Sequence, residues 1–317
     1  MPRELHILVP TDCSGDVITE IRHLAPHAMV HRNDELQRDP SLLDKLEITY
    51  GTLSSRQYAQ ARNLKWTHSL GAGCEWTQDP AVRDHPVVVT NSRIHAVQIS
   101  EHLFGLLLML MRRLQDAVKS QMRHTWDRPE SSLLHSLPGK TLCILGLGTI
   151  GRRCATLGKA HGMRVIGLRR QAKPTADVDV VLPSEKLDEA ISQADVIMNL
   201  LPGITSTAKV IGSKQFALMK PSCLLLNAGR GITIDTGALI VALQSGRIAG
   251  AGLDVIDPEP LPPESPLWDM PNVIITGHYS GSIDTYFQQA AEVFLRNLRH
   301  YLAGEPLEFV VDKTTGY

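Results

Sequence analysis

The chain has 317 residues, of which 43% are hydrophobic and 21% charged, so it can bury a sizeable core and global disorder is excluded. Its 32 Lys and Arg residues nearly balance its 33 Asp and Glu residues, which argues against a nucleic-acid-binding protein. The longest largely apolar run, residues 103–111, is far shorter than a membrane span, and the first residues lack the layout of a signal peptide. At ~150 residues per domain, this length indicates about two domains.

The cysteines give a further indication of the compartment. There are five, none of them paired at C-x-x-C spacing: Cys13, Cys74, Cys143, Cys154 and Cys223. An odd and scattered set argues against a disulfide framework or a zinc site and fits a reducing compartment. We therefore expect a cytoplasmic protein without a bound metal, acting on neither membranes nor nucleic acid.

Short apolar segments alternate with polar, helix-compatible segments along the whole chain. The predicted strands are His6–Val9, Glu47–Tyr50, Lys65–Leu70, Val87–Thr90, Thr141–Leu145, Met163–Leu168, Val196–Leu200, Cys223–Leu226, Gly250–Leu253 and Val273–Thr276. Continuous apolar strands with helical spacers are typical of parallel sheets that are covered on both faces. The fold class is therefore predicted to be α/β.

Two segments are harder to interpret from pattern alone. Ser100–Met122 contains no proline and one glycine, and it is apolar first and charged later, which predicts a single long helix. His23, His27 and His31 are spaced as on one helix face, but Pro26 argues against an unbroken helix there. We interpret these three histidines as surface residues.

The strand Thr141–Leu145 runs into the glycine motif Gly146-Leu147-Gly148-Thr149-Ile150-Gly151, which is followed by a helix-compatible segment. In a dinucleotide-binding turn, the first glycine permits the tight turn, the second lets the backbone approach a pyrophosphate, and the third allows close helix–strand packing. The anion then sits at the helix N-terminus. The alternative is a glycine-rich turn that binds no ligand.

The end of the next strand bears on the choice of cofactor. An NAD site typically has an acidic residue about 20 residues beyond the glycines, to bind the ribose 2′-hydroxyl. Here 169 − 151 = 18, and the residues are Arg169 and Arg170. A guanidinium can hold a 2′-phosphate through paired, charge-assisted hydrogen bonds. The sequence therefore favours NADP(H), with NAD(H) possible; the alternative is a solvated basic corner.

Polar residues follow three further strands in the second half of the chain. Arg230 comes after Leu224-Leu225-Leu226, Glu259 after Gly250–Leu253, and His278 after Val273-Ile274-Ile275. Ligands of open α/β sheets gather outside the carboxyl ends of the strands, so we expect these side chains to share one crevice. Taken singly, they could instead be an ion-pair partner, a turn carboxylate and a loop histidine.

These motifs together resemble the D-isomer-specific 2-hydroxyacid dehydrogenase family. The matching segments are Gly71-Ala72-Gly73, Ile99-Ser100-Glu101-His102, Gly146–Gly151, Asn227–Gly231, Gly252–Pro260 and Pro271–His278. The Arg169-Arg170 pair is similar to the NADPH-preferring glyoxylate/hydroxypyruvate reductase branch.

The resemblance implies two doubly wound parallel-sheet domains with a cleft between them. Residues 1–97 and 282–317 would form a flavodoxin-like substrate domain, to which Ile283–Ala303 returns as a helix, and residues 98–281 a Rossmann cofactor domain. It also implies a homodimer formed through the long helix after residue 98.

The resemblance also implies roles for the residues singled out above. Arg230 would bind the substrate carboxylate and polarise the keto oxygen. His278 would be the general acid in reduction and the base in oxidation, oriented and kept protonated by Glu259. Ala72 and Gly73 would offer backbone N–H groups to the substrate. The implied cofactor-binding residues are Gly146, Gly148, Thr149, Ile150, Gly151, Arg169, Arg170, Leu201, Pro202, Thr207, Ala228, Gly229, Asp254 and Ser280.

The function implied is reduction of a small 2-oxo acid, of the glyoxylate or hydroxypyruvate type, to the D-2-hydroxy acid. Some residues depart from the family pattern: Cys74-Glu75 replaces Val-Asp, Gly277 replaces proline, and Tyr279 follows the histidine. These departures leave the chemistry in place, but they leave open the alternative that the protein is a dehydrogenase for a bulkier 2-hydroxy acid. A non-catalytic dinucleotide sensor is the alternative of a different class.

Overall fold

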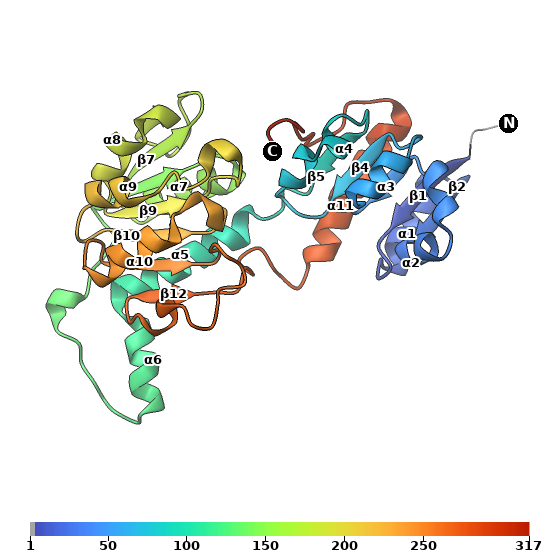
Figure 1. Cartoon of the computed structure of the whole chain (residues 1–317). Coiled ribbons are helices and arrows are strands. Elements are labelled where there is room, and N and C mark those ends of the chain that lie inside the picture. The colour runs from blue at the N-terminus through green and yellow to red at the C-terminus, as the bar shows by residue number, and fades with distance from the viewer. Residues whose placement is uncertain (1–3, 317) are drawn as a thin grey trace. The chain divides into compact units, whose positions relative to one another are not determined.

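The computed structural model describes residues 4–316, which divide into two compact units. The first unit comprises residues 4–94 and 283–316, and the second unit comprises His95–Ser282 (Figure 1). Each unit is built on a parallel sheet with helices on both faces, so the α/β class and the two parallel-sheet domains are confirmed. Within residues 4–316, none of the helices is both long enough and apolar enough to span a membrane.

The first unit contains a five-stranded sheet in the order β2-β1-β3-β4-β5, with every pair parallel. Its strands are β1 (Leu5–Val9), β2 (Ala28–Arg32), β3 (Ile48–Tyr50), β4 (Trp66–Ser69) and β5 (Val88–Asn91). Its helices are α1 (Gly15–Leu24), α2 (Asn33–Arg38), α3 (Ser55–Gln60), α4 (Pro80–Arg83) and, from the end of the chain, α11 (Tyr286–Ala303).

Alternate residues of the interior strand β1 belong to different cores, as expected for a sheet covered on both sides. Ile7 and Val9 pack with α1 and with Phe294 of α11, whereas Leu8 packs with Tyr58 of α3 on the other face. The C-terminal helix α11 therefore completes the fold of the N-terminal segment, and Figure 1 shows it alongside these strands.

The second unit contains a seven-stranded parallel sheet in the order β12-β11-β10-β9-β6-β7-β8. Its strands are β6 (Thr141–Leu145), β7 (Arg164–Arg169), β8 (Val180–Pro183), β9 (Val196–Asn199), β10 (Leu224–Asn227), β11 (Gly250–Leu253) and β12 (Val273–Ile275). Its helices are α5 (Ala96–Arg112), α6 (Leu114–Met122), α7 (Thr149–Ala160), α8 (Leu187–Ser192), α9 (Ser213–Leu218) and α10 (Thr236–Gln244). The strand order reverses between β6 and β9, the position at which ligands bind in open α/β sheets.

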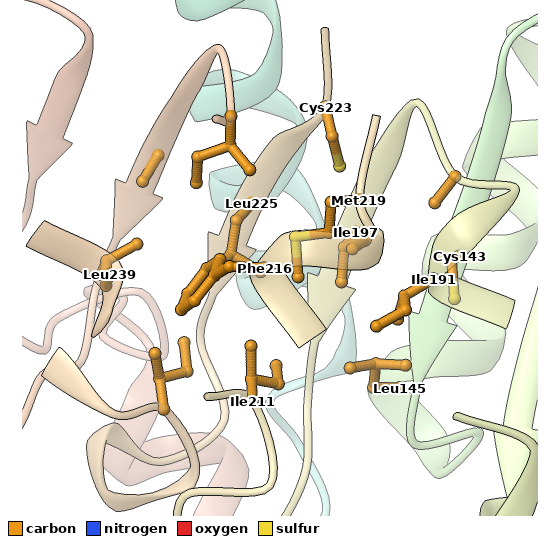
Figure 2. Packing of buried hydrophobic residues seen from close by; sticks show 14 of the residues in the cluster. Cys143, Leu145, Ile191, Ile197, Ile211, Phe216, Met219, Cys223, Leu225 and Leu239 are labelled. Carbon is orange, nitrogen blue, oxygen red and sulfur yellow. The ribbon is translucent and has the colours of Figure 1, made fainter. Parts of the chain in front are cut away.

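The core of the second unit has the same two-layer arrangement. Cys143 and Leu145 of β6 pack in a cluster with Phe216 and Leu239 from α9 and α10 (Figure 2). The intervening residue Ile144 faces α5 and α7 on the opposite side of the sheet. Both faces of each central strand are thus buried, which is why the strands are continuous apolar runs in the sequence.

The structure contains each predicted strand, with ends shifted by at most one residue, and two strands that the sequence did not indicate. β2 ends in two polar residues, His31 and Arg32, and β8 is a short edge strand. The prediction of one long helix over Ser100–Met122 is wrong: Arg113 adopts a left-handed conformation (φ 54°, ψ 37°) and separates α5 from α6. The segment contains no proline and one glycine, Gly105, so no helix-breaking residue marks the break at Arg113 in the sequence.

The surface interpretation of His31 is also wrong. His23 and His27 are exposed, but His31 lies in β2 with 8% of its surface exposed. Its Nε2 atom is 2.9 Å from Nδ1 of His6 in the neighbouring strand β1. The helical spacing of the three histidines was misleading because His31 belongs to a strand whose register sets its side chain against β1.

Candidate active site

The glycine motif forms the turn between β6 and α7. Gly146 has φ +106°, a backbone conformation that other residues rarely adopt. A Cβ atom on Gly151 would lie 2.1 Å from the carbonyl oxygen of Gly146, so only glycine lets α7 start this close to the turn. The fold of the protein itself therefore requires the first and third glycines.

Gly148 differs from the other two, because a Cβ atom built there would meet nothing within 4 Å. Gly148 is exposed and is the N-cap of the 12-residue helix α7, whose first backbone N–H groups have no side-chain cap from this residue. Open space in front of a helix N-terminus is what a pyrophosphate needs. The turn therefore leaves room for a dinucleotide in front of Gly148, at the N-terminus of α7.

The other residues expected to bind the cofactor follow neighbouring strands at the same edge of the sheet. Arg169 is the last residue of β7 and half-buried, and Arg170 is exposed. The remaining ones follow β9 (Leu201, Pro202 and Thr207), β10 (Ala228 and Gly229), β11 (Asp254) and β12 (Ser280). Since all seven strands are parallel, these positions lie at the edge of the sheet that is formed by the carboxyl ends of the strands.

Arg230, Glu259 and His278 follow the three adjacent strands β10, β11 and β12, respectively. The Nδ1 atom of His278 is 2.5 Å from Oε1 of Glu259. About half of each side chain is exposed: 50% for His278 and 41% for Glu259. A carboxylate on Nδ1 fixes the ring orientation and leaves Nε2 as the atom that can exchange a proton with a ligand.

Arg230 is half-buried on the loop after β10, and its Nη1 atom donates to the carbonyl oxygen of Gly229 at 2.8 Å. The next residue, Gly231, packs so closely against the β11 loop that a Cβ atom would lie 2.0 Å from the carbonyl oxygen of Ile256. The loops that carry Arg230 and Glu259 are therefore in direct backbone contact. The structure thus brings Glu259 and His278 together and places Arg230 on the adjoining loop.

Asp254 joins the β11 and β12 loops through its buried carboxylate, which is 1% exposed. Oδ1 accepts hydrogen bonds from the Thr276 hydroxyl at 2.7 Å, the Tyr279 N–H at 3.1 Å and the Ser280 N–H at 3.2 Å. Its backbone carbonyl accepts from the His278 N–H at 2.9 Å. Much of the acceptor capacity of Asp254 is therefore used to hold the loop that carries His278.

A buried amide network that the sequence analysis missed supports the β9 and β10 loops. Nδ2 of Asn199 donates to Oδ1 of Asn227 at 2.9 Å and to the Thr233 hydroxyl at 2.7 Å. Asn227 Oδ1 also accepts the N–H of Gly229 at 3.2 Å. An amide at the last position of an apolar strand, as in Val196–Asn199, is the signal that could have revealed it, because a buried amide must be hydrogen-bonded.

Ala72 and Gly73, the expected substrate-binding residues, lie in the first unit, on the loop after β4. Both are half-buried, and the Ala72 carbonyl oxygen accepts a hydrogen bond from Nδ2 of Asn91 at 2.7 Å. Asn91 ends the neighbouring strand β5, so this contact fixes the loop at the carboxyl edge of the first sheet. The position agrees with the edge at which α/β sheets bind ligands.

Comparison with known proteins gives the context of this arrangement. The family model described as D-isomer specific 2-hydroxyacid dehydrogenase, NAD binding domain, matches residues 104–280. A glyoxylate reductase of Thermococcus gammatolerans is 34% identical over 238 residues, which are 73% of this chain and 69% of that protein.

Solved structures agree over nearly the whole chain. A D-isomer specific 2-hydroxyacid dehydrogenase family protein from Aeromonas salmonicida superimposes with a TM-score of 0.85 and 33% identity, covering 98% of this chain and 99% of that one. The NADPH-dependent glyoxylate/hydroxypyruvate reductase of Sinorhizobium meliloti, solved with NADP and sulfate, gives a TM-score of 0.82 at 25% identity, covering 99% and 100%. With a dinucleotide-binding turn and a histidine–carboxylate pair at one sheet edge, this chain belongs to the D-isomer specific 2-hydroxyacid dehydrogenases, a family of nicotinamide-dependent oxidoreductases.

Proposed function

We propose that this protein reduces a small 2-oxo acid, of the glyoxylate or hydroxypyruvate type, to the D-2-hydroxy acid with NADPH as the preferred cofactor. The observation that carries the proposal is the His278–Glu259 contact at the carboxyl ends of β12 and β11, at the same edge as the dinucleotide turn. The similarity of this chain to proteins named glyoxylate reductase supports the proposed substrate class.

The proposed chemistry divides between the cofactor and the side chains. When bound, the nicotinamide supplies the hydride to the keto carbon. His278, with Glu259 on Nδ1, gives the proton at Nε2 to the keto oxygen in reduction and removes it in oxidation. Such a proton donor contributes about 10²–10⁴-fold to the rate. The glutamate keeps the ring in one orientation and balances the charge of the protonated imidazole.

Arg230 is proposed to bind the substrate carboxylate and to polarise the keto oxygen. A guanidinium offers a planar fork of donors that matches a carboxylate, and it stays charged throughout the reaction. The Gly231–Ile256 contact supports this role, because it fixes the loop of Arg230 against the loop of Glu259. In the first unit, Ala72 and Gly73 would offer backbone N–H groups to a substrate.

The cofactor is proposed to lie across the edge of the seven-stranded sheet. The pyrophosphate would bind at Gly146, Gly148 and the N-terminus of α7, and Arg169 with Arg170 would bind the 2′-phosphate of NADPH. The second unit would thus be the cofactor domain and the first unit the substrate domain. The Sinorhizobium meliloti structure was solved with NADP, which supports the proposal of NADPH as the cofactor.

The test is turnover of the purified protein with NADPH or NADH and a panel of 2-oxo acids, followed at the absorbance of the reduced nicotinamide. Faster oxidation of NADPH with glyoxylate or hydroxypyruvate than with bulkier acids is expected, and the product should be the D isomer. A preference for bulkier acids would contradict the substrate class. Tight NADPH binding without turnover of any acid would contradict the reductase assignment and favour a sensor.

We further propose that the protein is a homodimer that buries the apolar face of α6. Leu114, Val118 and Met122 are spaced four residues apart, so they share one face of the helix. They are 46%, 52% and 79% exposed, and Trp126 just beyond them is 90% exposed. Figure 1 shows α6 and the segment after it projecting from the second unit. Light scattering should give twice the mass of the chain, and Val118→Glu should give the mass of one chain.

A further inference from the structure

The side chain of His102, on helix α5, contacts the loop that carries His278. His102 lies near the start of α5, and its Nε2 atom is 2.9 Å from Oγ1 of Thr276. Thr276 is the first residue after β12 and is two residues before His278. The proposed reaction does not use either His102 or Thr276, so the contact needs its own explanation.

The direction of this hydrogen bond follows from counting protons. Thr276 has one hydroxyl proton, which it donates to Oδ1 of Asp254 at 2.7 Å. That oxygen also accepts two backbone N–H groups, so it serves only as an acceptor here. Thr276 can therefore only accept from His102, and Nε2 of His102 must carry a hydrogen. The hydrogen bonds run in one direction, from His102 to Thr276 to Asp254.

This series of hydrogen bonds holds the His278 loop on both sides of the histidine. Thr276 precedes His278, and the two N–H groups bound by Asp254 belong to Tyr279 and Ser280, which follow it. His278 itself has φ +56°, in the left-handed region that a non-glycine residue rarely occupies. A residue in that conformation persists only when its surroundings hold it there.

The packing of α5 explains why His102 can reach so far. Leu106 lies one turn beyond His102 on the same face of α5, and a Cβ atom added to Gly252 in β11 would be 3.1 Å from Cβ of Leu106. The absence of a side chain at Gly252 thus lets α5 lie directly on β11. His102 also meets the Tyr279 ring edge-on, with 5.4 Å between centroids.

We propose that His102 is a positioning residue for the reaction: its Nε2–H, through Thr276 and Asp254, fixes the backbone that aims His278. This inference rests on the proposed function for what His278 does, but not for the contact itself. The direct separation between Nε2 of His102 and Oδ1 of Asp254 is 3.7 Å, which is too long for a hydrogen bond, so the two side chains are joined through the Thr276 hydroxyl. The role needs a hydrogen-bond donor at Nε2, which distinguishes it from simple space filling.

The experiment compares His102→Leu, which removes the donor, with His102→Gln, whose amide N–H can take the place of Nε2–H. Glu101→Gln is the matched control, since Glu101 is exposed on the same helix. The imidazole signal of His278 is followed by NMR on protein with ¹³C-labelled histidine, assigned through His278→Asn, while kcat and KM are measured in parallel. The same comparison is repeated at Thr276, the next residue in the series of hydrogen bonds: Thr276→Val removes the hydroxyl, and Thr276→Ser keeps it.

We expect His102→Leu to move the His278 signal and to lower kcat about tenfold, because small misplacements of a reacting group are costly. The KM for the 2-oxo acid should change less than about threefold, and His102→Gln should restore kcat to within about threefold of the wild type. Thr276→Val should reproduce His102→Leu, and Thr276→Ser should resemble the wild type.

Two results would overturn the inference. One is a His278 signal in His102→Leu that coincides with that of Glu101→Gln; the other is His102→Gln being as impaired as His102→Leu. If His102→Leu does not fold, the Thr276 pair decides in the same way. If the wild-type protein turns over no 2-oxo acid, the proposed function fails, but the His278 signal still decides whether His102 positions the loop.

Discussion

Oε1 of Glu259 lies 2.5 Å from Nδ1 of His278, although the two residues are 19 positions apart and on separate loops. The contact exists because β11 and β12 are adjacent and parallel, so both loops leave the same edge of the sheet. Both side chains remain about half exposed. The pair is therefore fixed by the topology while its outer face stays accessible to a ligand.

Glu259→Gln should separate two roles of Glu259, which are to orient the His278 ring and to balance the charge of the protonated imidazole. The amide oxygen can still accept from Nδ1, but the protonated imidazole loses its counter-charge. We expect kcat for reduction to fall by roughly 10–100-fold, with the loss of activity on raising the pH beginning at a lower pH than in the wild type. Initial rates across pH at saturating cofactor measure this. Glu264→Gln is the control, because Glu264 is exposed nearby in the sequence; an unchanged profile for Glu259→Gln would contradict the role.

Arg230→Lys tests whether the fork of donors or only the positive charge is needed. Lysine keeps the charge but offers no planar pair of donors, so kcat/KM for the 2-oxo acid should fall about 100-fold or more. Cofactor affinity, measured by fluorescence titration, should stay within about twofold. Arg153→Lys, on the exposed face of α7, serves as the control. A variant as active as the wild type would remove Arg230 from the carboxylate site.

Gly148→Ala and Gly151→Ala form a matched pair in one turn. A Cβ atom on Gly151 would lie 2.1 Å from a backbone oxygen, so Gly151→Ala should destabilise the fold by about 1–3 kcal/mol. A Cβ atom on Gly148 meets nothing, so Gly148→Ala should cost about 0.5 kcal/mol or less yet weaken NADPH binding. Urea unfolding and NADPH titration check both. Full NADPH affinity in Gly148→Ala would show that no pyrophosphate lies there.

The strands and loops of this site could be predicted because the signals are local. An apolar run followed by a glycine motif or a polar residue marks the carboxyl end of a strand, and parallel strands bring those ends to one edge. The break at Arg113 could not be predicted, since a left-handed conformation at an arginine has no marker in the sequence such as a glycine or a proline. The contact between His102 and Thr276 joins residues 174 positions apart, and only the packing of α5 on β11 creates it.

Arg169→Asp tests the proposed binding of the 2′-phosphate. Arg169 ends β7, next to the strand that leads into the dinucleotide turn. A carboxylate there would repel the 2′-phosphate but could accept hydrogen bonds from the ribose hydroxyl of NADH. We expect kcat/KM to fall much more for NADPH, by about tenfold or more, than for NADH. Lys173→Asp, on the exposed segment after β7, controls for general charge reversal. Equal losses with both cofactors would contradict the assignment.

His68 should make the stability of the first unit depend on pH. Its ring is fully buried in β4, where it is hydrogen-bonded to Thr90 at 2.8 Å and Ser92 at 2.9 Å. Burial, with the nearby Arg296 guanidinium, lowers the pKa of His68 from 6.5 to about 3. Between these values the unfolded chain binds a proton that the folded chain does not, so stability falls as the pH falls, by up to about 1.4 kcal/mol per pH unit.

His68→Gln removes this titration while keeping a polar side chain opposite Thr90. The free energy of unfolding of wild type minus that of His68→Gln should therefore decrease as the pH is lowered from about 7 to about 5, in line with a one-proton slope. Urea unfolding at several pH values measures it, with His23→Gln, an exposed histidine of α1, as the control. Taking the difference between variants cancels the contributions of His6 and His85, whose pKa values burial also lowers. A difference that is constant with pH would mean that His68 already takes up its proton in the folded protein.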